Sequence, residues 1–389
     1  MLTENTGNDI LWWKGCEKVG WIIAVFALII IGLAFYIHFI VKRTFAAFGL
    51  DVKRRWVKLL SICLSIVSGL LCANPMSFFV IVVLHVLAFY ACLQLLGFVL
   101  HKTVGNRRFL SRRKIVLESA LIPMALTVLV LLAGYINLHS VEKTHYTVYT
   151  DKDIRQEGYR VALIADVHFG VSLDEKELLE KCKEISREEP DIVRLCGDIV
   201  DNSTAIEEMY VVFSALGSIE SKFGIYYVYG NHDRPMSMIK SGFTKEELEE
   251  VILSNGITVL KDDVTALTDD FTIVGREDRS VKGRAALAEL MGRVDQTDFV
   301  LTLDHQPSEY LENGKQGTDL LLSGHTHGGQ LFPINYLQKW IPFNDGVYGR
   351  YDIDSDTVAI ITSGFGTWSY PSKTAGPAEY VIIDIKQKT

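Results

Sequence analysis

The first 140 residues contain four apolar stretches that are each about long enough to cross a lipid bilayer. A span takes about 20 residues of α-helix, because no water is available inside the bilayer to satisfy a non-helical backbone. Asn74-Pro75 predicts a tight turn between the second and third stretches, so these two should form a helical hairpin. The expected spans cover residues 19–41, 57–73, 77–100 and 115–139. They predict a membrane region over residues 1–140.

The charged residues between these stretches predict how the chain is oriented. Two connections, 42–58 and 102–114, each hold six Lys and Arg side chains, whereas the short connection 73–77 holds none. Basic connections stay in the cytoplasm. Four spans then leave both chain ends outside. The sequence therefore predicts a multi-pass protein of the cell membrane, whose N-terminus and later domain lie on the extracytoplasmic side.

The composition changes after residue 140. Residues 1–140 hold 14 Lys and Arg against 5 Asp and Glu, whereas residues 141–389 hold 25 against 42. We expect a linker over 141–156 and a globular domain over 157–389. A surface this acidic repels phosphate backbones, which argues against a nucleic-acid partner. The six cysteines form no CxxC pair, so we predict neither a disulfide framework nor a cysteine-bound metal.

Short β-rich runs alternate with amphipathic helical patterns in this second region. Residues 159–165 are typical of a buried strand, and residues 172–188 of a helix with Ser172 as its N-cap. The alternation continues to about residue 254, after which short strands predominate. Early βαβ units followed by a strand-rich half predict an α/β domain with two packed sheets flanked by helices.

Polar side chains that can bind metals follow the ends of five predicted strands. Such strand ends meet at one edge of a sheet, so these side chains can converge. A chance turn or helix cap explains any one motif, but not all five in this order. In chain order the motifs are Asp166-Val167-His168, Gly197-Asp198-Ile199-Val200-Asp201, Gly230-Asn231-His232-Asp233, His305 and Gly324-His325-Thr326-His327.

The donor atoms in these motifs predict two metal ions. Oxygen and imidazole donors suit Mn, Fe or Zn, and they differ from the cysteine donors of structural zinc sites. Seven ligands are too many for one catalytic metal. They suit two ions about 3.5–4 Å apart that share a bridging carboxylate. The cofactors expected are therefore two divalent ions, with manganese favoured and iron or zinc as alternatives.

The ordered motifs resemble those of the calcineurin-like metallophosphoesterase superfamily. The sequence GHTHGGQ at 324–330, followed by Leu331-Phe332-Pro333, is similar to the bacterial phosphodiesterase branch. The resemblance covers roughly residues 157–386 and implies a four-layer α-β-β-α fold with a binuclear site. It implies that one metal is bound by Asp166, His168 and His327, that the other is bound by Asn231, His305 and His325, and that Asp198 bridges them.

The resemblance also implies a mechanism. A metal-bridged hydroxide would attack phosphorus in line, while the metals neutralise charge on the phosphoryl oxygens. His232 resembles the general acid that protonates the leaving oxygen, and Asp201 matches the carboxylate that orients it. Asp233 has either a supporting role next to a ligand or a plain structural one. Where the branch often carries Pro-x-Arg, this chain has Pro371-Ser372-Lys373, and Lys lacks the planar fork of Arg, which leaves the substrate class open.

The function expected is a membrane-anchored phosphodiesterase or pyrophosphatase acting on a lipid-linked or membrane-proximal phosphoester. The short connection to the last span would hold the domain near the bilayer. Two segments after site motifs, 235–243 and 334–343, are apolar enough to contact lipid, although they can instead pack on the domain's own core.

Three alternatives compete with this prediction. The enzyme could act on soluble nucleotides or phosphomonoesters. A metal-binding sensor without turnover would lack a ligand or His232, and neither is missing. A transporter would need polar, broken spans, which these are not. The sequence leaves the physiological substrate, the metal and the oligomeric state open.

Overall fold

The computed structural model describes residues 6–75, 77–104, 114–234, 242–338, 340 and 344–388. The chain divides into two compact units, Met1–Val130 and Leu131–Thr389. Five cysteines are free: Cys63, Cys72, Cys92, Cys182 and Cys196.

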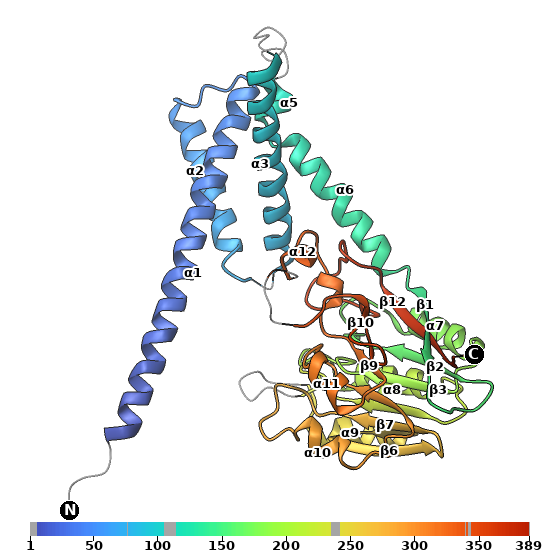
Figure 1. Ribbon diagram of the computed structural model, residues 1–389. Coiled ribbons are helices and arrows are strands. Elements are labelled where there is room, and N and C mark those ends of the chain that lie inside the picture. The colour runs from blue at the N-terminus through green and yellow to red at the C-terminus, as the bar shows by residue number, and fades with distance from the viewer. Residues whose placement is uncertain are drawn as a thin grey trace, which may run out of the picture. The chain divides into compact units, whose positions relative to one another are not determined.

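The first unit is built from helices, and the last of these continues into the second unit (Figure 1). Three described helical segments are long and apolar enough to cross a membrane: Ala24–Ala47, Phe78–Leu100 and Leu121–Leu138. Four spans were expected, and α2 is the one that does not qualify. Its 17 residues are about 25 Å long, against about 30 Å of hydrocarbon. The helices are α1 (Thr6–Ala47), α2 (Arg55–Leu71), α3 (Phe78–Val104), α5 (Lys114–Glu118) and α6 (Leu121–Leu138).

Helix α2 nevertheless has the surface of a membrane helix. Large apolar side chains such as Leu59 and Leu70 are more than half exposed. Its buried positions include Ser61, Ser65 and Gly69, which recur every four residues. At Gly69 a Cβ atom would lie 3.1 Å from the Cβ of Ala34 in α1, so the two backbones approach closely. Small residues between helices and apolar residues outside are typical of packing within lipid.

The second unit contains two sheets, each with six strands among the described residues (Figure 1). In sheet A the strands β2 to β5 are parallel, and β12 runs antiparallel to β2. Across sheet A the order is β1 (Glu142–Thr150), β12 (Glu379–Gln387), β2 (Tyr159–Ile164), β3 (Ile192–Cys196), β4 (Ile225–Val228) and β5 (Ile257–Val259). Across sheet B it is β10 (Gly349–Asp352), β11 (Val358–Ile361), β9 (Leu320–Ser323), β8 (Phe299–Leu303), β7 (Phe271–Gly275) and β6 (Asp263–Thr268).

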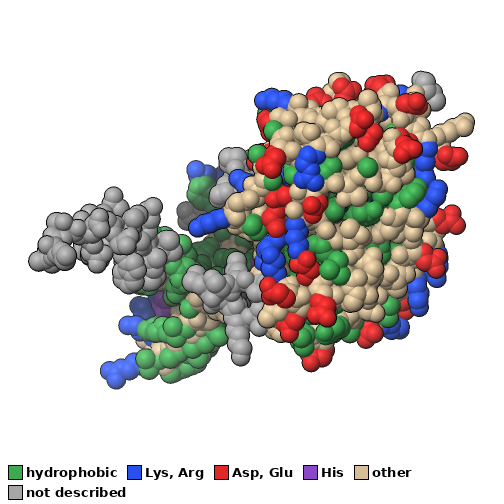
Figure 2. Space-filling model, turned by 90° about the horizontal axis from the view of Figure 1, so that it is seen from below, with side chains coloured by type: hydrophobic (Ala, Val, Ile, Leu, Met, Phe, Trp, Pro, Cys, Tyr) green, Lys and Arg blue, Asp and Glu red, His purple; other side chains and the backbone are tan. Residues whose placement is uncertain are grey.

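Alternating side chains of the strands divide the core into separate clusters. Val193 and Leu195 of β3 pack with α7 (Glu175–Arg187), α8 (Ile206–Gly217) and α9 (Lys245–Ser254) on one face of sheet A. The opposite face packs against sheet B, where Ile192 shares a core with Leu301. The outer face of sheet B is covered by α10 (Leu287–Met291) and α11 (Tyr310–Gln316). Acidic side chains are spread over the visible surface of the globular part (Figure 2).

Two boundaries differ from those expected. Helix α7 begins at Glu175, because Asp174 caps it and forms a capping box with Glu177, so Ser172 is not the N-cap. Residues 142–150, expected in the linker, form β1, which pairs in parallel with β12 from Glu142↔Glu379 to Thr150↔Gln387. Only residues 139–141 separate this strand from α6.

Candidate metal centre

The predicted ligands come together where strands of both sheets end. Asp166 and His168 follow β2, Asp198 and Asp201 follow β3, and Asn231 and His232 follow β4, all in sheet A. His305 follows β8, and His325 and His327 follow β9, in sheet B. The two-sheet architecture thus supplies donors from both sides of one site.

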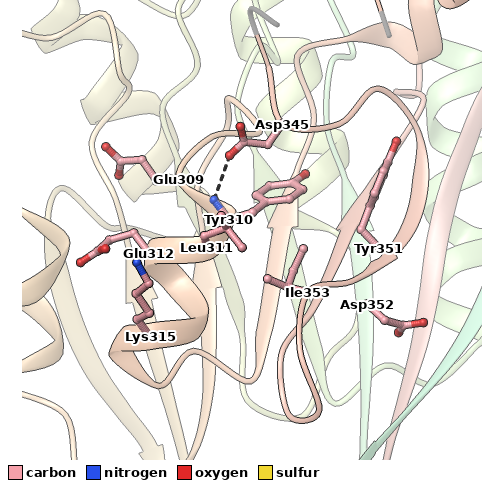
Figure 3. A pocket seen from close by; sticks show the side chains of 9 residues that line it. All are labelled: Glu309, Tyr310, Leu311, Glu312, Lys315, Asp345, Tyr351, Asp352 and Ile353. Atoms are coloured by element: carbon pink, nitrogen blue, oxygen red, sulfur yellow. Dashed lines mark hydrogen bonds between the residues drawn. The ribbon is translucent and has the colours of Figure 1, made fainter.

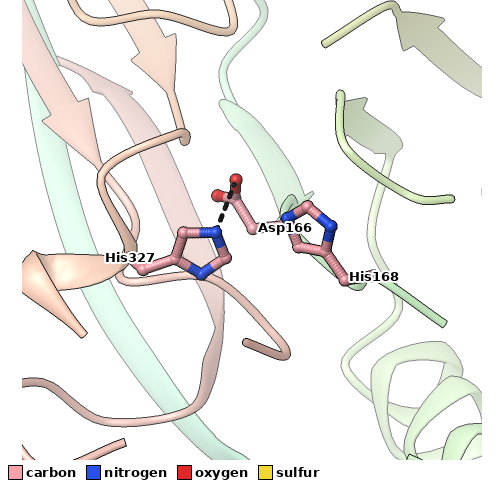
Figure 4. A group of neighbouring side chains, drawn as sticks. All are labelled: Asp166, His168 and His327. Carbon is pink, nitrogen blue, oxygen red and sulfur yellow. Dashed lines mark ion pairs between the residues drawn. The ribbon is translucent and has the colours of Figure 1, made fainter. Parts of the chain in front are cut away.

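The first cluster consists of Asp166, His168 and His327 (Figure 4). One donor atom from each lies within 4.8 Å of the others, and all three residues are buried. His327 Nε2 is 3.7 Å from Asp166 Oδ1, and the His168 and His327 rings are 5.1 Å apart. This geometry leaves room for one cation between the donors.

The second cluster consists of Asp198, His305 and His325, whose donor atoms also lie within 4.8 Å of one another. Asp198 Oδ2 is 3.1 Å from His305 Nε2 and 3.8 Å from His168 Nε2 in the first cluster. Asp198 is therefore the carboxylate that lies within reach of both clusters. Asn231 lies in the turn where the backbone N–H of His232 donates to Asp198 Oδ1, at 2.7 Å.

Several buried donor atoms lack hydrogen-bond partners within the described chain. They include Nε2 of His168, Nδ1 of His327 and Oδ1 of Asn231. An unsatisfied buried polar group costs about 1–3 kcal/mol. His305 Nδ1 lies 2.8 Å from the carbonyl of Cys196, which turns Nε2 toward Asp198 Oδ2 in the second cluster, where it could bind a cation. These residues fit two divalent ions.

The backbone is strained at these same positions. Five residues of the two clusters have positive φ: Asp166 (55°), His168 (43°), Asp198 (52°), His325 (72°) and His327 (51°). Each such conformation costs about 1–3 kcal/mol, persists only where the surrounding structure enforces it, and is common at active sites. The GNHD motif needs glycine at position 230, because a Cβ atom there would overlap Asp198 Oδ1.

Burial and nearby carboxylates together set the charge state of the donors. Burial lowers the pKa of His168 and of His305, but carboxylates such as Asp198 outweigh this effect and raise both pKa values. Burial raises the pKa of Asp166 to about 6, with His305 opposing the shift and Asp198 adding to it. Burial lowers the pKa of His325 to about 4, and it also lowers that of His327. Both rings are therefore neutral near pH 7, as a metal-binding imidazole must be.

Comparison with known proteins decides the class of this site. The family model of calcineurin-like phosphoesterases matches residues 159–329, a range that includes every residue of the two clusters. Residues 159–329 are thus similar to the calcineurin-like phosphoesterases. The chain is a metal-dependent phosphoesterase, as the sequence predicted.

Three curated relatives are similar to longer stretches of the chain than the family model covers. An uncharacterized metallophosphoesterase of Campylobacter jejuni is 27% identical over 68% of this chain and 70% of its own length. A transmembrane protein with a metallophosphoesterase domain from Danio rerio is 24% identical over 87% of this chain and 76% of its own. An uncharacterized metallophosphoesterase of Aquifex aeolicus is 28% identical over 67% of this chain and 98% of its own. The apolar helices and the zebrafish relative together indicate membrane association.

Asp233 supports the phosphoesterase site through the backbone. Its buried carboxylate accepts hydrogen bonds from the N–H groups of Asp198, Ile199, Val200 and Gly230, at 2.7–3.1 Å. These bonds fix the turn that carries Asp198. Asp233 therefore positions a cluster residue from behind the site.

His232 and Asp201 lie beside the first cluster. Asp201 is 3.4 Å from His168 Nδ1 and 3.8 Å from His232 Nδ1, so it can orient both rings. Burial raises the pKa of Asp201, but His168 and His232 outweigh this effect and lower it, which keeps the carboxylate ionised. The ring of Trp368 lies 5.1 Å from that of His232.

A cavity of about 380 Å³ opens beside the phosphoesterase site. Asp198, His232, His325 and His327 line one side of it, and Leu331, Ile334, Trp368 and Tyr370 form an apolar wall. Sequence reasoning missed Trp368 and Tyr370. No sequence signal pointed to them, because they are linked to the site through their backbone: the side-chain amide of Gln330 donates to their carbonyls, at 3.0 and 3.3 Å.

A larger cavity, of about 630 Å³, lies elsewhere, around α11 (Figure 3). Glu309, Tyr310 and Tyr351 are among its lining residues, and the Tyr310 N–H donates to Asp345 at 2.9 Å. None of the residues that line it belongs to the two clusters. The smaller cavity is therefore the one that a substrate of this site would enter.

Proposed function

We propose that the chain is a membrane-anchored phosphodiesterase or pyrophosphatase with two divalent metal ions, manganese being favoured. Asp166, His168 and His327 would hold one ion, and Asn231, His305 and His325 the other. Asp198 would bridge them. The observation that carries this proposal is that Asp198, a member of the second donor cluster, also lies 3.8 Å from His168 in the first. The packing of two sheets between helices supports a four-layer α-β-β-α fold for the domain.

The chemistry is divided between the ions and the chain. When bound, the two ions would activate water and neutralise charge on the phosphoryl group. His232, which lines the cavity, protonates the leaving oxygen, and Asp201 holds its ring. Asp233 keeps Asp198 in place through the backbone of its turn.

The substrate that we propose is a lipid-linked or membrane-proximal phosphoester. Beside the cavity lies a short helix, α12 (Ile334–Gln338). We define the α12 surface as Phe332, Ile334, Tyr336, Leu337 and Trp340. These side chains are 40–83% exposed, and Trp340 is the most exposed of them. Ile334 belongs to both this surface and the cavity wall, so the two are continuous. Exposed apolar patches mark contact surfaces, and Trp and Tyr favour the headgroup zone of bilayers.

The other segment expected to contact lipid, residues 235–243, gives less support to a lipid substrate. Residues 235–241 and 341–343 lie outside the described residues. Phe243 is 4% exposed and packs in the core with α9, so at this position the alternative of core packing is correct.

Substitutions in the α12 surface should separate lipid from soluble substrates. A Leu337→Ala, Trp340→Ala double variant is expected to raise the KM for a lipid phosphodiester in vesicles by about tenfold, since the loss of buried apolar area weakens interfacial binding. Hydrolysis of a soluble aryl diester should not change. Leu311→Ala is the matched control, because Leu311 is 71% exposed and lines the other cavity. Equal effects on both substrates, or faster turnover of soluble nucleotides than of any lipid, would refute the lipid proposal.

We further propose four spans, with the catalytic domain outside the cytoplasm. The small buried residues of α2 support a fourth span. Charge supports it too: with three spans the two basic connections, 42–58 and 102–114, would lie on opposite faces of the membrane, against the usual bias.

Protease treatment of spheroplasts should reveal this topology. Protease added outside intact spheroplasts is expected to cleave the domain after residue 140 and to spare both basic connections. In permeabilised spheroplasts the protease should cleave these connections too. Mass spectrometry of the released peptides is the measurement. A domain that stays intact until permeabilisation would place the enzyme in the cytoplasm.

A further inference from the structure

Lys373, the residue that replaces the expected Arg, is not among the residues that line the cavity. It is fully buried, and its ammonium group donates to the carbonyls of Ser363, Gly364 (2.9 Å) and Gly366 (3.2 Å). Each ammonium proton thus has an acceptor in the loop that follows β11. Lys373 therefore holds a loop, and the difference between Lys and Arg here has no bearing on phosphate contact.

The loop held by Lys373 lies directly against the metal centre. The N–H of Phe365 donates to the carbonyl of Ala165, and the N–H of Gly366 to that of Asp166, both at 2.9 Å. Gly364 has φ +84°, and a Cβ atom there would lie 2.8 Å from the Cβ of Asp166. The Ser363 hydroxyl donates to the carbonyl of His327, at 3.3 Å. Asp166 and His327 of the first cluster are thus both in direct contact with this loop.

The last turns of α6 hold the main chain at Lys373. The side-chain amide of Asn137 donates to the carbonyls of Lys373 and Gly376, each at 2.7 Å. The N–H of Lys373 donates in turn to the carbonyl of Gly134, at 3.1 Å. A Cβ atom at Gly134 would overlap Ser372, so the helix and this segment are in close contact. All of these residues belong to the unit Leu131–Thr389.

We propose that the end of α6 is a positioning element of the metal centre. Asn137 fixes the main chain at Lys373, and the Lys373 ammonium fixes residues 363–366 against Asp166 and His327. The helix that would carry the chain through the membrane thereby supports the ligands of one metal. This inference rests on the proposed function for the roles of Asp166 and His327, whereas the contacts themselves do not depend on it.

The test compares Asn137→Ala and Lys373→Met with His139→Ala in the full-length protein in detergent. His139 is the matched control, because it also ties the end of α6 to the domain, through Glu177 at 2.9 Å, but does not contact the loop. Hydrogen exchange is measured first in metal-free protein. We expect the amides of Phe365 and Gly366 to exchange about tenfold faster in the first two variants and at the wild-type rate in His139→Ala.

Manganese binding is then measured by calorimetry. Asn137→Ala should weaken one of the two binding events by about 10–100-fold, the range found when a group supporting a metal ligand is removed. Because Lys373→Met leaves three buried carbonyls unpaired and could prevent folding, Asn137→Ala alone suffices for the decision. Wild-type exchange and wild-type manganese affinity in Asn137→Ala would overturn the proposal. The exchange result stands even if the wild type binds no manganese, an outcome that would refute the proposed function instead.

Discussion

Asp198→Ala is expected to reduce hydrolysis of an aryl phosphodiester to the rate measured with a strong chelator. Asp198 is the carboxylate within reach of both clusters, 3.1 Å from His305 and 3.8 Å from His168. Its removal takes a ligand from both proposed ions at once. The rate is measured on the full-length protein with added manganese, alongside the metal content of each preparation.

Asp174→Ala is the matched control for this experiment. It removes an acidic side chain from the same domain, but that side chain caps α7 and belongs to neither cluster. It should cost about 1 kcal/mol of stability and leave activity unchanged. Full activity of Asp198→Ala, or of the wild type with a strong chelator present, would contradict the two-metal site.

His232→Ala should retain both ions and lose about 10²–10⁴-fold in rate, the usual contribution of one acid–base group. His232 lines the cavity next to Asp201 and Trp368 but belongs to neither donor cluster. The loss should shrink for a substrate whose leaving group needs no proton, such as a nitrophenolate. Rates with good and poor leaving groups are compared at equal metal content.

An exposed histidine of the same domain serves as the control for His232. His145 lies on β1, the edge strand of sheet A, and pairs with Asp384 of β12, so His145→Ala should leave both rates unchanged. If the metal content of His232→Ala collapsed, His232 would be a ligand and its assignment as general acid would be wrong.

The site was predictable because its side chains follow strands whose direction the sequence indicates. Once β2, β3 and β4 are recognised as parallel strands, Asp166, Asp198 and Asn231 must lie at one edge of the sheet. The positions of Asp233 and Lys373 were not predictable in the same way. Their roles are hydrogen bonds to backbone groups, and the residue type alone does not tell which backbone lies opposite.

Other misses come from partners that are distant in the sequence. β1 lies within the expected linker. Residues 144–150 are rich in the β-branched and aromatic residues of strands, but the partner strand β12 is more than 200 positions away. Phe243 follows a site motif in an apolar segment, and only the packing of α9 shows that its ring is part of the core. α2 has the composition of a span, but its length depends on where Asn74-Pro75 ends the helix.

The connection between α6 and β1 has a kinetic consequence. With only residues 139–141 between a candidate span and a core strand, the domain cannot diffuse away from the bilayer that holds the helix. Encounter with a lipid in the same leaflet then becomes a search in two dimensions. Its frequency depends on the mole fraction of that lipid among its neighbours and hardly at all on the volume of the surrounding solution. Such an enzyme could work on a scarce lipid with a modest intrinsic affinity, because tethering already supplies a high effective concentration.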